Sequence, residues 1–108
     1  MDYRIEFYNS SVQMTIEEWP PDINACFTRI TAMMIKHGPN LGMLYTKAFG
    51  DGLFEIRAKG IDGIGRAFFC TLANKRIIIL HGLIKKTQKT PVHELKIAKQ
   101  RLKELERG

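Results

Sequence analysis

The chain has 108 residues, 44% of them hydrophobic, and carries a formal net charge of +6. A chain of this length is about one domain and buries enough surface to fold without disulfides or metals, so we predict a single domain over residues 1–108. Its longest apolar runs, "AFFC" and "IIIL", fall far short of the roughly 20 residues that cross a bilayer, which excludes a membrane-spanning helix and predicts a soluble protein.

Three elements are predicted before residue 44. In "YRIEFY", apolar and charged side chains alternate, which is typical of a strand with one buried face. "SSVQMTIEEW" is predicted as a helix because Ser10 and Gln13 have the capping-box spacing, and a second helix, capped by Asp22, runs until Gly38. The apolar stripes of this helix hairpin are Val12, Ile16 and Trp19, then Ile23, Phe27, Ile30 and Met34.

From Leu44 onward the pattern changes from helical to extended. The runs "LYTKAF", "GLFEIRA", "GRAFFCTL" and "RIIILHGLIK" are separated by turn sequences, so we predict an antiparallel meander of four strands. In the second run, alternation puts Leu53, Glu55 and Arg57 on one face, where Glu55 and Arg57 are expected to be displayed together. "IIIL" does not alternate, which indicates a central strand covered on both faces.

The chain ends in a predicted helix, "TPVHELKIAKQRLKELERG", with Thr90 as its N-cap and Pro91 at its first position. Its apolar stripe is Leu95, Ala98, Leu102 and Leu105. The predicted fold class is therefore α+β, with an N-terminal strand and a helix hairpin packed on an antiparallel β-sheet, followed by a C-terminal helix.

Positive charge is concentrated in the second half of the chain. Residues 1–44 carry three Lys or Arg against five acids, residues 45–84 carry six against three, and residues 85–108 carry eight against three. A one-sided basic field attracts polyanions, so RNA, DNA or an acidic protein is the expected partner. The alternative is a solvated basic helix face that serves only solubility.

The two cysteines, Cys26 and Cys70, fall on a predicted helix face and in an apolar strand. Met1 is followed by "DYRIEF" and not by the apolar core of a signal peptide. We therefore expect a protein of the reducing cytoplasm with no disulfide and no export.

Several classes of site are excluded by the motifs that are missing. The sequence has no G-x-x-x-x-G-K-[ST], which argues against a P-loop, and no G-x-S-x-G, which argues against a hydrolase elbow. His37, His81 and His93 lie on three different predicted elements, so no metal site is expected. The glycines of "GDG" and "GIDGIG" stand between strand-like runs and are interpreted as hairpin turns.

A group of cations remains at the ends of adjacent predicted strands. Arg57 and Arg66 flank one turn and should face each other with an anion or water between them. The positions expected around them are Lys85 and Lys86, with Glu55 and His81 nearby. Guanidinium groups bind phosphate bidentately, which makes this a candidate phosphate site. An exposed cross-strand pair, a rim histidine and solvated loop charges are the alternative.

RNA cleavage at such a site would need three contributions. A base takes the proton of the 2′-hydroxyl, donors spread the charge of the phosphorane, and an acid protonates the leaving 5′-oxygen. Arginine is a poor base, which leaves a lysine, Glu55 or His81 for proton transfer.

The order of elements, with "GLFEIRA", "GRAFFCTL" and above all "HGLIKKTQKTP", resembles the RelE/HigB superfamily of bacterial toxins, in its phage-derived Gp49-like HigB branch. The resemblance implies catalytic roles for Arg57, Arg66, Lys85 and Lys86. Where the family often has tyrosine, this chain has "FF", Phe68 and Phe69, and so lacks the phenolic proton donor. An aromatic ring can still stack on a base, which is the role expected of Phe69. The residues expected to bind RNA are Glu55, Phe69, His81 and Lys89.

The resemblance also implies a function: a ribosome-dependent mRNA endonuclease that needs no metal or other cofactor. Its expected partners are mRNA and ribosomal RNA at the A site, and an antitoxin of HigA type with a helix-turn-helix domain. A ParE-like toxin of the same fold, which binds a topoisomerase and has no nuclease activity, is the main alternative. A non-enzymatic RNA-binding module is another.

Overall fold

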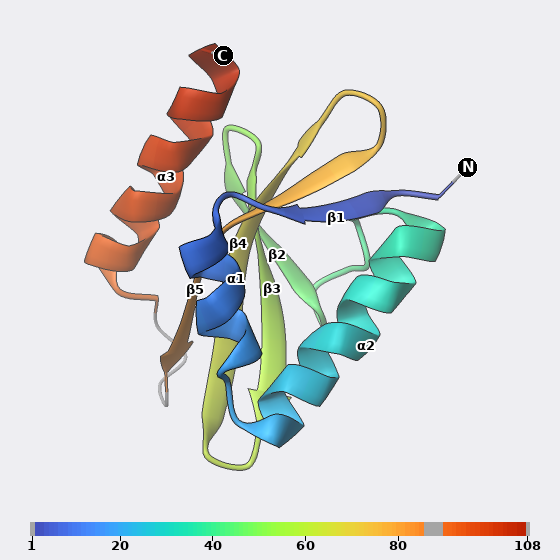
Figure 1. Cartoon of the computed structure of the whole chain (residues 1–108), viewed down its shortest axis with the longest axis vertical. Helices are drawn as coiled ribbons and strands as arrows, with labels where there is room; N and C mark the ends of the chain where they lie inside the picture. Colours follow the sequence, from blue (N-terminus) through green and yellow to red (C-terminus); the bar gives the residue numbers. More distant parts are fainter. Residues whose placement is uncertain (1, 86–89, 108) are drawn as a thin grey trace.

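The computed structural model describes residues 2–85 and 90–107. Five strands form one sheet in the order β1-β5-β4-β3-β2, with α1 and α2 on one face and α3 on the other (Figure 1). The elements are β1 (Arg4–Phe7), α1 (Ser10–Glu17), α2 (Pro21–His37), β2 (Thr46–Gly50), β3 (Leu53–Gly60), β4 (Gly63–Leu72), β5 (Arg76–Lys85) and α3 (Val92–Arg107). The predicted α+β class and the predicted order of elements are confirmed.

The helix hairpin packs as its apolar stripes predicted, but both helices start differently. The N-cap of α1 is Asn9, whose side-chain oxygen accepts a hydrogen bond of 2.9 Å from the backbone N–H of Val12. Helix α2 begins at Pro21, because proline needs no hydrogen-bond acceptor in the first turn. Asp22 therefore lies inside the first turn, and the predictions of Ser10 and Asp22 as caps are wrong.

The four predicted runs form the antiparallel strands β2 to β5. Strand β1 joins this sheet as well, pairing in parallel with β5 so that Arg4 lies opposite Arg76 and Phe7 opposite Ile79. The sheet is therefore mixed. The chain leaves β1, crosses one face as α1 and α2, and re-enters the sheet at its far edge (Figure 1).

The sheet separates two hydrophobic cores, and β5 contributes to both. Ile77 and Ile79 pack in the core beneath α1 and α2, whereas Ile78 and Leu80 pack in the core beneath α3. All four side chains are buried, which confirms the prediction that "IIIL" is a strand covered on both faces.

Helix α3 covers the second core with the predicted stripe of Leu95, Ala98, Leu102 and Leu105. It begins at Val92, one residue later than expected. The hydroxyl of Thr90 donates a hydrogen bond of 3.1 Å to Glu55. The prediction that helix capping explains this side chain is therefore wrong. Within the described ranges, no helix is both long and apolar enough to cross a membrane.

Two irregularities of pairing set which side chains face α3. In β2 the register shifts between Ala48 and Gly50, which puts Lys47 opposite Glu55. Between β4 and β5, Phe68 pairs with His81 while Phe69 pairs with Ile79, so that Leu80 is an extra residue. Such a bulge re-aims the side chains that follow it, and His81 consequently lies on the face of α3.

Candidate active site

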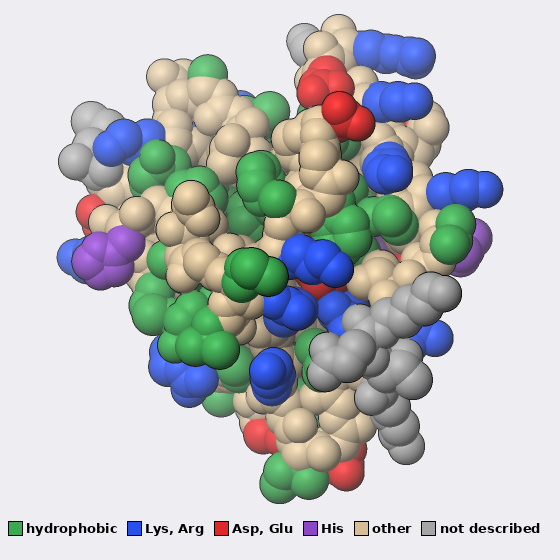
Figure 2. All heavy atoms as spheres, turned by 180° about the vertical axis from the view of Figure 1, so that it is seen from behind, with side chains coloured by type: hydrophobic (Ala, Val, Ile, Leu, Met, Phe, Trp, Pro, Cys, Tyr) green, Lys and Arg blue, Asp and Glu red, His purple; other side chains and the backbone are tan. Residues whose placement is uncertain are grey.

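The candidate site lies on the sheet face that α3 covers in part. Lys and Arg side chains gather in the middle of this face (Figure 2). Arg57 of β3 and Arg66 of β4 are direct cross-strand partners, as the turn between them predicted. Paired strands hold opposite side chains close together on the same face, so the two guanidinium groups belong to one site.

Glu55 and Arg66 form a buried ion pair in this site. A guanidinium nitrogen of Arg66 lies 2.9 Å from Glu55 Oε1, and the two side chains are 2% and 0% exposed. Glu55 Oε2 accepts the hydrogen bond from Thr90, so both carboxylate oxygens are engaged. The prediction that Glu55 is displayed at the surface with Arg57 is wrong, because the carboxylate turns inward to neutralise Arg66. An anion beside Arg66 is thus supplied by the protein itself.

Arg57 remains partly exposed beside this pair. Its Nη2 donates a hydrogen bond to the backbone carbonyl of Met43, and its backbone N–H donates one of 2.9 Å to the carbonyl of Tyr45. Its Nε is buried and has no hydrogen-bond partner in the described part of the chain. Arg57 is therefore anchored at one end of its guanidinium group, while the side chain as a whole stays partly exposed.

Strand β5 brings two more predicted residues to the same face. The Nε2 atom of His81 lies 3.1 Å from Glu94 Oε2 of α3, a contact that orients the imidazole ring. Lys85 is exposed at the end of β5, opposite Ile64 of β4. The other two lysines that the sequence singled out, Lys86 and Lys89, lie outside the described residues.

Phe69 is not on this face. Its side chain is 0% exposed in the core beneath α1 and α2, where it stacks on Phe54 with ring centroids 5.6 Å apart. A nucleotide could stack on it only if the core opened, so the prediction of Phe69 as a base-stacking platform is wrong. The strand alternation of "AFFC" puts Phe68 on the side of the site instead, but this ring is buried as well.

Sequence reasoning missed three residues of the site. Lys47 lies opposite Glu55 in the pairing of β2 and β3, and its Nζ is 5.2 Å from the centre of the Phe49 ring. The other two are Thr90, which bonds Glu55, and Glu94, which bonds His81. The alternation of "TKAF" signals that Lys47 and Phe49 share a face, but only the register shift in β2 reveals that this face is the one of the site.

The core beneath α3 contains a cysteine. Burial raises the pKa of Cys70, which also packs beneath α3, to about 11, so this group is a neutral thiol at physiological pH. Among residues 2–85 and 90–107, no three His, Cys, Asp or Glu side chains gather as ligands of a metal ion.

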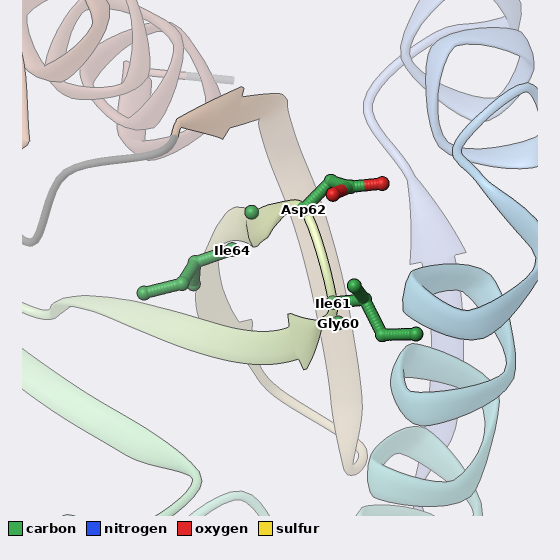
Figure 3. A pocket seen from close by; sticks show the side chains of 5 residues that line it. Gly60, Ile61, Asp62 and Ile64 are labelled. Atoms are coloured by element: carbon green, nitrogen blue, oxygen red, sulfur yellow. The ribbon is translucent and has the colours of Figure 1, made fainter.

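A hollow of about 390 Å³ lies at the turn between β3 and β4 (Figure 3). It is lined by residues 60–64 alone, and its one charged lining side chain is the carboxylate of Asp62. Because a carboxylate repels phosphate, this hollow is not a candidate for binding a nucleic acid.

Comparison with known proteins places the chain in a family. A family model described as "Phage derived protein Gp49-like" matches residues 14–103. The chain belongs to this Gp49-like family. Among curated proteins, none matches the chain.

A solved structure shares the fold of this Gp49-like protein. It is that of the archaeal RelE-RelB complex from Pyrococcus horikoshii OT3, with a TM-score of 0.58 and 17% sequence identity. The match covers 82% of this chain and 100% of the other. The family match confirms the Gp49-like part of the resemblance found in the sequence, and the shared fold confirms its RelE-like architecture.

Proposed function

We propose that this Gp49-like protein is the toxin of a type II toxin-antitoxin system, a ribosome-dependent endonuclease that cleaves mRNA by attack of the 2′-hydroxyl group. The observation that carries the proposal is the pairing of Arg57 with Arg66 across β3 and β4, on the face to which β5 also brings His81 and Lys85. Membership in the Gp49-like family and the RelE-like fold support it. The cleavage step needs no metal or other cofactor in this proposal.

We assign a role to each side chain of the site from its exposure to solvent. Arg57 and Lys85 reach the surface, so we assign them to the scissile phosphate, where they stabilise the charge of the phosphorane. Arg66 is 2% exposed and paired with Glu55, so we assign it to holding Glu55 in place and not to binding the phosphate. Glu55 is 0% exposed, so the 2′-hydroxyl does not reach its carboxylate, and we assign it as a positioning residue.

Proton transfer falls to the remaining groups. His81, oriented by Glu94, is suited to protonate the leaving 5′-oxygen, because histidine is the side chain that most often transfers protons in enzymes. Lys85 or Lys86 would then take the proton of the 2′-hydroxyl, and Lys89 would steer the substrate. The basic second half of the chain would dock on ribosomal RNA and on the transcript in the A site.

The proposed partners follow from the same assignment. The solved relative was crystallised as a complex of RelE with RelB. By analogy, this protein would be neutralised by a co-encoded antitoxin, for which we propose a HigA type with a helix-turn-helix domain. Its place of action would be the cytoplasm, where ribosomes and messages are found.

The test is induction of the gene in cells, followed by measurement of translation and by mapping of transcript ends. We expect the wild-type chain to stop translation and to cut messages within coding regions. Arg57→Ala should lower cleavage by about 10²–10³-fold, the usual cost of losing one stabilising donor. Arg76→Ala is the matched control. Arg76, at the start of β5, forms an ion pair with Glu6 of β1, away from the site.

Three results would overturn the proposal. Undiminished toxicity of the Arg57→Ala/Arg66→Ala double variant would show that the site is wrong. DNA damage signalling without RNA fragments would favour the ParE-like alternative, and protection of ribosomal RNA without cleavage would favour a non-enzymatic binding module.

A further inference from the structure

A second group of cations lines a small cleft between α2 and the end of β3. The cleft has a volume of about 170 Å³. Its lining comes from α2, from the segment before β2 and from β3, and consists of Cys26, Arg29, Leu44, Tyr45, Arg57 and Lys59. Arg57 thus belongs both to this cleft and to the candidate active site.

The charge of this cleft is uncompensated. Three of its lining side chains are cations and none is an acid. Within the described residues, neither Arg29, Arg57 nor Lys59 forms an ion pair. Glu55, the acid on the strand and face of Arg57, already bonds Arg66 and Thr90. Such a site attracts an anion from solution.

The hydrogen bonds of Arg29 and Arg57 also favour the binding of an anion. An Nη2 of Arg29 lies 3.6 Å from the thiol of Cys26, which is a weak acceptor. Arg57 binds the carbonyl of Met43 with one nitrogen, while its buried Nε has no partner in the described part of the chain. Neither contact is an ion pair, so both guanidinium groups keep their positive charge. A phosphate oxygen is the acceptor that guanidinium groups bind best.

The volume of the cleft limits what can enter. Pockets for whole small molecules begin at about 300 Å³. A cleft of about 170 Å³ suits a single phosphate group, whereas a base or a complete nucleotide would have to lie outside it.

We propose that Arg29, Arg57 and Lys59 form a second phosphate subsite, which holds the RNA backbone beside the scissile phosphate. That the ligand is RNA rests on the proposed function, whereas the affinity for backbone phosphate rests on the cleft itself. A strand whose scissile phosphate lies at Arg57 and Lys85 would pass around the edge of β3 and place a neighbouring phosphate between Arg29 and Lys59.

The test uses the full chain and a single-stranded RNA with 2′-O-methyl groups, which cannot be cleaved because the attacking hydroxyl is blocked. Binding is measured by fluorescence anisotropy over a series of salt concentrations. We expect Arg29→Gln/Lys59→Gln to weaken binding about tenfold or more. Its plot of log K against log salt should be shallower by about 0.7 for each phosphate that the variant no longer neutralises.

The matched control is Arg4→Gln/Lys36→Gln. It also removes one arginine and one lysine, but at exposed positions of β1 and of the end of α2. It should leave both the affinity and the salt slope close to those of the wild-type chain. Both double variants change exposed side chains, so equal unfolding midpoints are expected and should be verified.

Three outcomes would overturn the subsite: equal effects of the two double variants, no binding by the wild-type chain, or a selective loss of binding to a poly-glutamate peptide without loss of RNA binding. The last would identify an acidic protein segment as the occupant. Failure of the proposed function appears separately, as an absence of cleavage on translating ribosomes. A selective loss of RNA binding would uphold the subsite even then.

Discussion

Two glutamate–arginine pairs of the same length lie in different surroundings. Glu55 and Arg66 are 2.9 Å apart with both side chains buried, whereas Glu6 and Arg76 are 2.9 Å apart with more than a third of each side chain exposed. An exposed pair adds little to stability because water screens it. A buried pair is different, since loss of one partner leaves an uncompensated charge in the core.

We therefore expect Glu55→Gln to lower the free energy of unfolding by about 3–5 kcal/mol, measured by urea denaturation at neutral pH. The same substitution at Glu6 should cost less than about 1 kcal/mol. Equal losses from the two substitutions would show that Arg66 finds another counterion or that water reaches the buried pair.

At the scale of elements, Asp22 ties α2 to the hairpin of β3 and β4. Its carboxylate accepts a hydrogen bond of 2.8 Å from the backbone N–H of Ile61 and one of 2.9 Å from that of Ile23. The bond from Ile61 holds the pKa of Asp22 below its ordinary value. The hairpin can approach because Gly60 has no side chain, as a Cβ there would lie 2.6 Å from a carboxylate oxygen of Asp22.

The lowered pKa predicts how stability depends on pH. The contribution of Asp22 is fully present above the unfolded pKa of an aspartate and is lost as the pH falls through the lower folded pKa. Asp22→Ala should therefore lose less stability than the wild-type chain between pH 7 and pH 3. Hydrogen exchange at the Ile61 amide should be faster in the variant at pH 7. An unchanged exchange rate would mean that Asp22 does not hold the hairpin.

The strands and helices could be predicted from the sequence because each carries its own period and its own turn residues. The pairing of Arg57 with Arg66 followed from the short turn between β3 and β4. The direction of His81 did not follow, because Leu80 is inserted opposite β4 and strand alternation alone does not reveal an inserted residue. The inward turn of Glu55 was missed for another reason: its partner Thr90 is 35 residues away in the chain.

At the scale of the whole molecule, α3 covers the core on its own side of the sheet and shields it from water. Ending the chain after Lys85 would expose large side chains that α3 now covers, among them Leu53, Phe68, Ile78 and Leu80. Each is worth about 1.5–3 kcal/mol when buried. Their sum is comparable to the roughly 5–15 kcal/mol that stabilise a domain. We expect this truncated chain to lose its cooperative thermal unfolding transition, measured by circular dichroism.

Ending the chain after Leu105 is the matched control, because it keeps the whole apolar stripe of α3. This shorter truncation should retain a cooperative transition. A cooperative transition in the longer truncation would instead mean that the core beneath α1 and α2 is sufficient for folding.

The parallel pairing of β1 with β5 has a consequence for the nascent chain. Residues 4–7 are made well before their partners, residues 76–79, so a long loop must close before the edge of the sheet forms. His81 and Lys85 follow in the same strand, and Glu94 follows in α3. Synthesis therefore delays the complete fold until β5 and α3 have left the exit tunnel. A protein proposed to attack ribosomes would thus be inert towards the ribosome that is making it.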